Sequence, residues 1–252
     1  MNLWVITACL NEHEHIEKHM KYLNFLSIKY NINYVISDGG SSDGSLHIIK
    51  GMMSNNSILI ENGGSIYQSW NLAIDKIYAV FSHLVFLGVN DEITEDFIKK
   101  IMNIRGEYDL LYAGIIIDKK KYPIKSPIQL DNWIDSPTTC MSLHHCGTIF
   151  SRRLFVEIGL FSTKYKIASD LDWMLKIKTI TDLKIYLFND YGVLMRGGGI
   201  SNSSHNSLTL IREEFLISIK NKLIPCPKRF IFNLASLVLN FINKIFKHEQ
   251  CQ

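Results

Sequence analysis

The chain has 252 residues, of which 47% are hydrophobic and 20% are charged, and its net charge is +3. This composition is typical of a globular protein and excludes a disordered chain, and the length suits one large domain with appendages. The small net charge gives no support for nucleic acid as a partner.

Strands and helices are predicted to alternate over residues 1–92. Short apolar runs predict strands at 3–10, 34–36, 58–60 and 84–87. Between them, apolar residues at helical spacing predict three helices, which carry Ile16, Met20 and Leu23, then Leu46, Ile48 and Ile49, then Trp70, Ala73, Ile74 and Ile77. We expect Ser41, Ser42 or Asp43 to cap the second helix. The alternation indicates βαβ units around a parallel sheet.

Polar residues follow three of these strands, as Asn11-Glu12, Asp38 with two glycines, and Asn90-Asp91. The carboxyl ends of parallel strands share one edge, so these loops are expected to converge on a ligand. The turn after the first strand has no glycine, which excludes the dinucleotide fingerprint, and the chain has no P-loop motif. Asp91 is therefore interpreted as a ligand of Mg²⁺ or Mn²⁺ that holds a diphosphate. The alternative is that Asp91 or Thr94 caps the next helix.

The pattern changes after residue 92. A long strand at 108–118 is expected to turn back through a hairpin at 119–123, and the proline-rich stretch 126–139 is expected to be a long loop. Residues 144–150 read as a strand. A short helix ending at Gly159 and another starting at Ser169 complete the second half.

Seven segments, in order, resemble the family-2 glycosyltransferases with the GT-A fold. They are VITACLNE at 5–12, VISDGGSSDG at 35–44, IYQSWNLAI at 66–74, LGVND at 87–91, HCGTIFSRRLF at 145–155, IASDLD at 167–172 and RGGGIS at 196–201. The resemblance covers about residues 3 to 201. It implies an α/β fold of the GT-A type, with a mostly parallel central sheet flanked by helices.

The resemblance also implies roles for individual residues. The nucleotide sugar would be bound by Thr7, Leu10, Glu12, Asp38, Asn71, Asn90 and Arg196. Asp38 would accept a hydrogen bond from the base, and Asn71 would lie beside the donor sugar or diphosphate. Asp91 would bind the divalent cation, Mn²⁺ or Mg²⁺. Asp170 would be the catalytic base, and a single base favours inversion at the anomeric carbon.

Two positions depart from the family pattern. Asn90 replaces the first acid of the metal motif, so the site has one negative charge fewer, and Ser169 stands where many relatives have an acid. Asp170 has a simpler alternative role as an acidic residue at a helix start. Asp172 is the competing acid but is expected to point elsewhere on the helix. His145 and Asp172 are kept as candidates on the acceptor side.

The C-terminal residues 206–252 are expected to form a helical tail that associates with a membrane. Polar residues lie three or four apart on one narrow face, apolar residues fill the rest, and basic residues flank the stretch; the polar positions are Asn233, Ser236, Asn240, Asn243 and Lys247. The basic flanks suit an anionic membrane surface. A docking helix or a dimer contact is the alternative. The five scattered cysteines, with neither a signal peptide nor a spanning segment in evidence, predict a cytoplasmic protein at the inner face of the cell membrane.

These observations give one overall interpretation. Residues 1–205 are expected to form a catalytic domain, with a nucleotide-binding part at 1–92 and an acceptor-side part at 93–205. The predicted activity is an inverting transfer of a hexose from UDP-glucose or UDP-galactose to a lipid-diphosphate-linked sugar. It would serve bacterial surface polysaccharide synthesis, for O-antigen or capsule. The alternatives are a transferase with a soluble acceptor and a non-catalytic module that binds sugar nucleotides.

Overall fold

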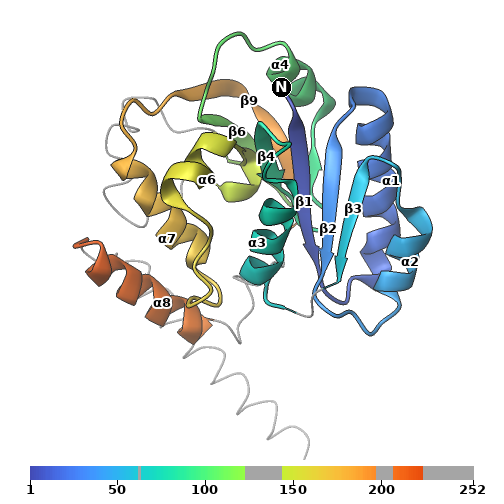
Figure 1. Cartoon of the computed structure of the whole chain (residues 1–252), viewed down its shortest axis with the longest axis horizontal. Coiled ribbons are helices and arrows are strands. Elements are labelled where there is room, and N and C mark those ends of the chain that lie inside the picture. Colours follow the sequence, from blue (N-terminus) through green and yellow to red (C-terminus); the bar gives the residue numbers. More distant parts are fainter. Residues whose placement is uncertain (62–63, 123–143, 197–206, 224–252) are drawn as a thin grey trace, which may run out of the picture.

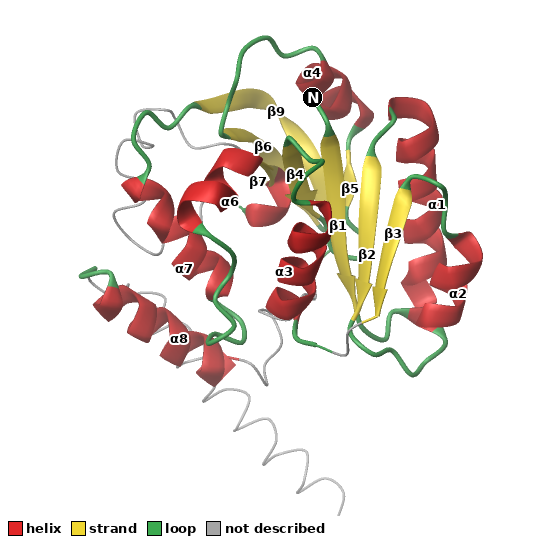
Figure 2. Cartoon of the chain, viewed as in Figure 1, coloured by secondary structure: helices red, strands yellow, loops and turns green. Residues whose placement is uncertain are grey.

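A computed structural model describes residues 1–61, 64–122, 144–196 and 207–223, and they form one central sheet with helices on both of its faces (Figures 1 and 2). This arrangement confirms the expected α/β class. The predicted loop at 126–139, most of the last motif at 196–201 and residues 224–252 of the predicted tail lie outside the described residues.

The sheet has nine strands in the order β3-β2-β1-β4-β8-β6-β9-β5, and β7 pairs with β6. Their bounds are β1 (Leu3–Cys9), β2 (Asn33–Asp38), β3 (Ser57–Glu61), β4 (His83–Phe86), β5 (Glu92–Ile93), β6 (Leu110–Ile117), β7 (Lys120–Tyr122), β8 (Thr148–Ser151) and β9 (Ile185–Met195). The first four strands in the chain pair in parallel, as predicted. The predicted hairpin is also present, because β6 and β7 pair antiparallel.

The direction of the strands changes in the middle of the sheet. β8 lies between β4 and β6 and runs antiparallel to both, with Val85 opposite Ile149 and Leu84 opposite Phe150. β6 and β9 are parallel, whereas β5 and β9 are antiparallel. The second half of the sheet is therefore mixed. As a consequence, the beginning of β8 lies at the same sheet edge as the end of β4.

The helices and short 3₁₀ turns are α1 (His13–Tyr30), α2 (Ser45–Met52), α3 (Ile66–Ile77), α4 (Glu95–Met102), η2 (His145–Gly147), α6 (Arg152–Ile158), α7 (Ser169–Lys176), η3 (Ile177–Thr179) and α8 (Ser207–Lys220). α3 begins with a capping box between Ser65 and Gln68. α6 ends at Gly159, as predicted, with a left-handed φ of 83°. None of the helices in the described ranges is long and apolar enough to cross a membrane.

Two local predictions were wrong. The cap of α2 is Gly44, whose φ is 94°, because Asp43 instead accepts the backbone N–H of Ser45 from outside the helix at 3.0 Å. Residues 145–147 form a 3₁₀ turn and not the start of a strand. The Gly147 N–H donates to the His144 carbonyl at 2.9 Å and closes the turn. A Cβ on Gly147 would lie 2.7 Å from Ile115, so the turn needs glycine there.

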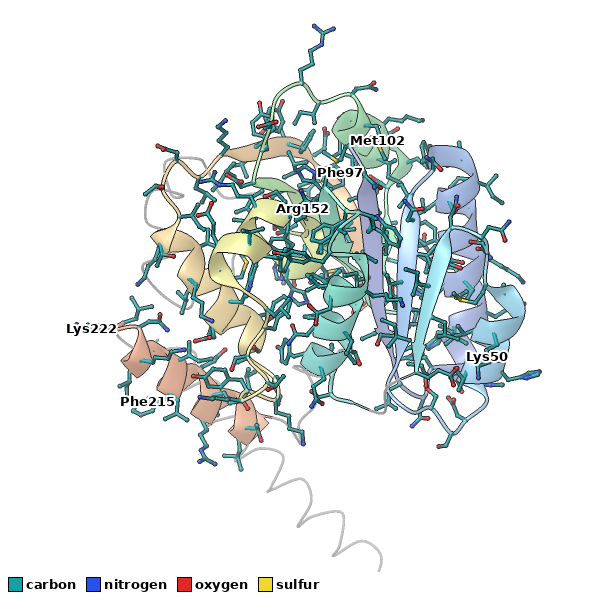
Figure 3. All side chains as sticks on the ribbon, in the orientation of Figure 1. Lys50, Phe97, Met102, Arg152, Phe215 and Lys222 are labelled. Atoms are coloured by element: carbon teal, nitrogen blue, oxygen red, sulfur yellow. The ribbon has the colours of Figure 1, made fainter. Side chains whose placement is uncertain are left out.

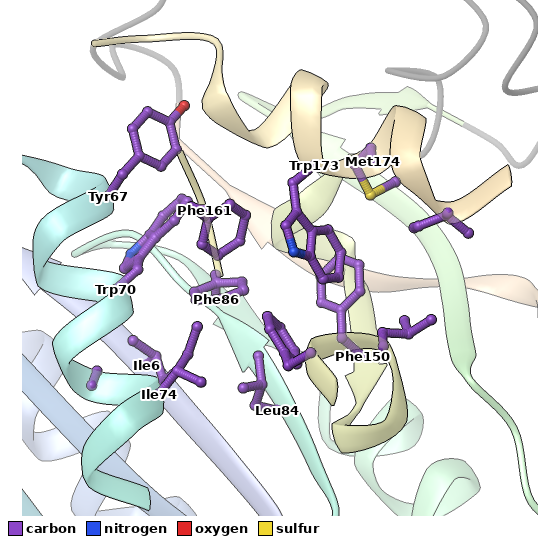
Figure 4. Packing of buried hydrophobic residues seen from close by; sticks show 14 of the residues in the cluster. Ile6, Tyr67, Trp70, Ile74, Leu84, Phe86, Phe150, Phe161, Trp173 and Met174 are labelled. Atoms are coloured by element: carbon purple, nitrogen blue, oxygen red, sulfur yellow. The ribbon is translucent and has the colours of Figure 1, made fainter. Parts of the chain in front are cut away.

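Apolar side chains fill both sides of the sheet because strand residues alternate between its faces. Leu3 and Val5 pack with α1, α2 and α4, whereas Trp4 and Ile6 belong to the cluster with α3, α6 and α7. In that second cluster, Trp173 stacks on Phe155 with ring centres 4.8 Å apart. The Trp173 ring also packs against Phe150 and Phe161 (Figure 4). Each such buried side chain contributes about 1.5–3 kcal/mol. This packing fixes α7, and thus Asp170, against the sheet.

Candidate active site

The loops after β1 and β2 meet at the edge of the sheet where their strands end. The Gly39 N–H donates to the Cys9 carbonyl at 2.8 Å, which joins the two loops. A Cβ on Gly39 would lie 3.2 Å from the carbonyl oxygen of Gly64, so the segment before α3 approaches the same point. Glycine at this position allows the three backbones to come close together.

The structure brings three of the four predicted nucleoside-binding residues to this edge. Leu10 follows β1 and is 55% exposed, which is high for a leucine. The Glu12 carboxyl group is partly buried, and burial raises its pKa. Asp38 is buried and accepts hydrogen bonds from the backbone of Gly40 and Ser41 and from the Ser41 hydroxyl. Its carboxylate therefore organises the glycine-rich loop.

Thr7 is placed differently from the other three. Its side chain is fully buried, and its hydroxyl lies 3.0 Å from Nε2 of His19 on α1. Burial also lowers the pKa of His19 to about 4, so this pair is neutral at ordinary pH. Any contact between Thr7 and a nucleoside would therefore involve the backbone.

Asp91 follows β4 at the same edge. Its Oδ2 accepts the Gly88 N–H at 2.9 Å, and its Oδ1 accepts the Arg196 N–H at 3.4 Å. Burial raises the pKa of Asp91 to about 6, against the opposing effects of these two bonds and of His145. The alternative role as a helix cap falls to Thr94, whose hydroxyl accepts the Phe97 N–H. Asp91 is thus a buried carboxylate that gains stability from a positive charge nearby.

Asn90 supports a cation at this position. Its backbone has a φ of 97°, a left-handed conformation that is uncommon outside glycine. Its Oδ1 is buried and has no hydrogen-bond partner among the described residues. Within that part of the chain no group of three or more His, Cys, Asp or Glu side chains is arranged to hold a metal ion by itself. Mg²⁺ and Mn²⁺ suit such a site, because they are often held by one or two protein oxygens together with substrate phosphates.

The two remaining candidates for binding the nucleotide sugar, Asn71 and Arg196, make different contacts. Asn71 uses both ends of its amide on the backbone of Phe161, donating to the carbonyl at 2.8 Å and accepting the N–H at 3.0 Å. It therefore ties α3 to the loop before α7. Arg196 is exposed, and only its backbone N–H contacts Asp91. Its backbone directly follows the end of β9, beside the carboxylate predicted to bind the cation.

Asp170 lies in the first turn of α7, and both of its carboxylate oxygens are engaged. Oδ1 lies 3.0 Å from the Tyr67 hydroxyl and accepts the Leu171 N–H at 2.9 Å. Oδ2 lies 3.2 Å from Nδ1 of His145. Burial disfavours the charged form, but His145, Tyr67 and the Leu171 N–H hold the pKa of Asp170 below its usual value. Asp170 is therefore ionised at neutral pH.

His145 links the two carboxylates of the site. Burial disfavours its charged form, but Cys146 and Asp170 hold the pKa of His145 well above its usual value. Its Nε2 lies 3.2 Å from the Cys146 sulfur, and its ring packs near Trp70 at 5.3 Å. The same imidazole acts on the pKa of Asp91. The structure thus brings Asp91, His145 and Asp170 together.

Asp172 is not part of this group. It is 1% exposed and forms ion pairs with Lys220 at 2.7 Å and with Lys176 at 3.1 Å. The prediction that it points away from Asp170 is confirmed, and its contacts anchor α8. Tyr67, in contrast, was not assigned a role from the sequence, although it lies in the quoted segment 66–74. The available signal for Tyr67 was its position, with an aromatic hydroxyl, inside a segment that resembles the family.

Comparisons with known proteins point to glycosyltransferases. No family model matches the chain. Curated relatives include a "PGL/p-HBAD biosynthesis glycosyltransferase" of Mycobacterium bovis (strain BCG / Pasteur 1173P2), 24% identical over 197 residues, which are 72% of this chain and 70% of the relative. A Mycobacterium tuberculosis (strain ATCC 25618 / H37Rv) glycosyltransferase matches to the same extent.

Solved structures with a similar fold include complexes with nucleotide sugars. S. aureus TarS 1-349 in complex with UDP-GlcNAc has a TM-score of 0.62 at 18% identity, over 98% of this chain and 73% of that one. The mannosyltransferase PcManGT from Pyrobaculum calidifontis, in complex with GDP-Man and Mn²⁺, has a TM-score of 0.57 at 13% identity, over 93% and 68%. The fold is similar to glycosyltransferase structures and consistent with the GT-A type. The relatives support a glycosyltransferase.

Proposed function

We propose that this protein is an inverting glycosyltransferase that moves a hexose from UDP-glucose or UDP-galactose to a sugar hydroxyl. The observation that carries the proposal is the position of Asp170, an ionised carboxylate held by His145 and Tyr67, with the same His145 also acting on the pKa of Asp91. A base and a cation ligand on either side of a reacting sugar are the two groups that the reaction needs.

Asp170 accepts the proton of the acceptor hydroxyl as its oxygen attacks the anomeric carbon. The bond from that carbon to the diphosphate breaks, and its electron pair leaves with the nucleoside diphosphate. Attack from the face opposite the diphosphate inverts the anomeric centre. His145 contributes by keeping Asp170 ionised and in place, since its Nδ1 lies 3.2 Å from Oδ2 of the base.

Asp91 and Asn90 are the residues that would hold Mn²⁺ or Mg²⁺. Such a cation neutralises the charge that develops on the departing diphosphate. Asp91 fits this role because burial, which raises its pKa, disfavours its negative charge, and a cation would offset that cost. Asn90 fits because its Oδ1 is buried without a partner among the described residues. The Mn²⁺ in the PcManGT complex and the UDP-GlcNAc in the TarS complex support a similar site here. Arg196 is proposed to contact the diphosphate.

A donor screen tests this proposal. The purified protein is incubated with UDP-glucose, UDP-galactose, UDP-GlcNAc and GDP-mannose, with Mn²⁺, with Mg²⁺ or with chelator, and release of nucleoside diphosphate is measured. We expect release from one UDP-hexose, and we expect chelator to abolish it. The anomeric configuration of the product is read by NMR. Release that persists in chelator would remove the cation from the reaction, and retention of configuration would overturn the inverting mechanism.

We further propose that the protein binds the cytoplasmic face of a membrane and acts there on a lipid-diphosphate-linked sugar in surface polysaccharide synthesis. α8 supports this because Leu208, Phe215, Leu216 and Ile219 are between 46% and 64% exposed. Figure 3 shows Phe215 on the outer side of this helix. Arg212, Lys220 and Lys222 are exposed basic residues of the same region. Apolar surface with basic neighbours suits an anionic lipid interface.

Vesicle sedimentation tests the membrane proposal. The full chain, a form lacking residues 226–252, and the variant Phe215→Ser are mixed with vesicles that contain or lack anionic lipid. We expect the full chain to sediment with anionic vesicles, and the truncated form to be released while still hydrolysing the donor. Phe215→Ser should bind less tightly. Equal recovery of the full chain with and without vesicles would overturn the membrane proposal and favour a soluble acceptor.

A further inference from the structure

α8 carries a buried carboxylate that contacts the segment before α7. Glu213 is 8% exposed, its Oε1 accepts the Lys166 N–H at 2.7 Å, and its Oε2 accepts the N–H groups of Ile167 and Ala168 at 2.9 and 3.0 Å. The N-cap residue of α7 is Ala168, which has no side chain able to cap the helix. Glu213 instead binds the backbone that leads into α7, at the N-cap residue and the two residues before it, through charge-assisted bonds near the positive end of the helix.

The same segment is connected directly to Asp170. The Ile167 carbonyl accepts the Tyr67 hydroxyl at 2.5 Å, and this hydroxyl lies 3.0 Å from Oδ1 of Asp170. Figure 4 shows the Tyr67 hydroxyl at the outer end of its ring, away from the packed cluster around Trp70. The backbone of Ile167 is thus held at two groups. Glu213 accepts its N–H, and its carbonyl accepts the Tyr67 hydroxyl.

α8 holds α7 at a second point. Lys220 pairs with Asp172 at 2.7 Å, two residues after Asp170. Ile217, one turn from Glu213, is fully buried in the cluster that contains Trp173. α8 therefore lies along α7 with one contact before Asp170 and one after it (Figure 1).

We propose that Glu213 is a positioning residue for the base Asp170, acting through the peptide of Ile167 and the hydroxyl of Tyr67. This inference rests on the proposed function, in which Asp170 accepts the acceptor proton. It gives α8, which the sequence placed in a membrane tail, a second role in the alignment of the base.

The substitution Glu213→Gln tests the proposal with little change in volume. The amide oxygen of glutamine can accept from part of the segment, but its NH₂ group faces a backbone donor. The segment is then expected to move away from Tyr67, and Asp170 loses its alignment. We expect kcat to fall by about 10- to 100-fold, as for a small misplacement of a reacting group. The KM for the donor should not change, and the acid limb of the pH–rate profile should move to higher pH.

Glu214→Gln is the matched control, because it removes the same charge one residue away. It is expected to keep the wild-type kcat and pH profile. Tyr67→Phe tests the second half of the connection: it should reduce kcat, and the double variant Tyr67→Phe with Glu213→Gln should lose less than the product of the two single losses. Independent, multiplicative losses would overturn the connection, as would a Tyr67→Phe variant with wild-type kinetics.

An NMR titration of His145 separates failure of this inference from failure of the proposed function. The imidazole signal of His145 is assigned through its loss in His145→Asn, and its pKa is compared among the wild type, Glu213→Gln and Glu214→Gln. We expect a lower pKa of His145 in Glu213→Gln alone, because Asp170 is displaced from its ring. A Glu213→Gln protein that melts at a lower temperature but keeps the His145 titration would show that Glu213 only stabilises the fold. This measurement applies even if no nucleotide sugar is turned over.

Discussion

Nδ1 of His145 lies 3.2 Å from Oδ2 of Asp170, and the two residues reach each other from different halves of the acceptor-side region. His145 is in the 3₁₀ turn before β8, and Asp170 is in the first turn of α7. The contact lowers the pKa of Asp170 although burial acts in the opposite direction. The proposed base is therefore kept ionised by a neighbour that has no need to touch the substrate.

The first prediction concerns this contact. His145→Asn removes the imidazole charge, so the pKa of Asp170 should rise. Because the base works in its ionised form, the acid limb of kcat/KM should move to higher pH by the same amount. The profile is measured between pH 4 and 9 with saturating cation. An acid limb at the wild-type position would mean that His145 does not control the ionisation of the base.

The second prediction separates the two carboxylates. Asp170→Asn and Asp91→Ala should each lower turnover by at least ~10², as expected for loss of a base or of a cation ligand. Asp170→Asn should still bind UDP with cation in calorimetry, since Asp170 is proposed to contact the acceptor and not the nucleotide. Asp96→Asn, in the exposed first turn of α4, is the control and should be fully active. Full activity of Asp170→Asn would exclude it as the base.

The third prediction is a pH dependence of cation binding. The pKa of Asp91 is raised from 3.8 to about 6, so a proton competes with the cation below pH 6. Apparent affinity for Mn²⁺ should fall by about tenfold per pH unit below that value. In the metal-free protein the raised pKa costs stability as pH rises towards 6. Mn²⁺ with UDP should therefore raise the melting temperature more at pH 7 than at pH 5, and equal shifts would contradict the assignment.

The fourth prediction concerns Asn90, which has a left-handed φ and an Oδ1 atom with no hydrogen-bond partner in the described part of the chain, two reasons for its presence. Asn90→Asp should lower the half-saturating Mn²⁺ concentration by on the order of tenfold, because it adds a ligand charge. Asn90→Gly keeps the turn but removes the amide, and should weaken cation use. Wild-type cation use in Asn90→Gly would show that Asn90 serves only the backbone turn.

The fifth prediction concerns Asn71. Both ends of its amide bond the backbone of Phe161, so Asn71→Leu should leave that N–H and carbonyl without partners. We expect a loss of about 1–3 kcal/mol in the free energy of unfolding, measured with urea. Kinetics of the same variant test the predicted contact with the donor. A raised KM for the donor supports that contact, whereas an unchanged KM assigns Asn71 to the fold alone.

The donor half of the fold could be predicted closely, because each of its strands is a short apolar run followed by polar residues. The edge that gathers Leu10, Asp38 and Asp91 follows from the parallel pairing alone. The burial of Thr7 could not be predicted, since its partner His19 lies twelve residues away on a helix. Residues 145–147 were misread as a strand because a 3₁₀ turn of three residues has no periodicity to detect.

The contacts that hold Asp170 in place were the least predictable part of the candidate site. Asp170 was found through its resemblance to a family segment, but no local pattern connects it with Glu213, which is more than forty residues further along the chain. A glutamate in an amphipathic helix is usually solvated. In the structure, the packing of Ile217 and the ion pair between Lys220 and Asp172 turn the side of α8 that carries Glu213 inwards.

The reversal of strand direction between β4 and β8 has a further consequence. Asp91 follows the end of β4, and His145 precedes the start of β8. The two strands pair antiparallel, with Val85 opposite Ile149. The hydrogen-bonded pairing of β4 with β8 therefore sets the distance between Asp91 and His145. A slip by one residue would move them by about 3.3 Å and turn each side chain to the opposite face. Evolution can therefore lengthen or exchange the surrounding loops to accept new sugars while this ladder keeps the distance constant.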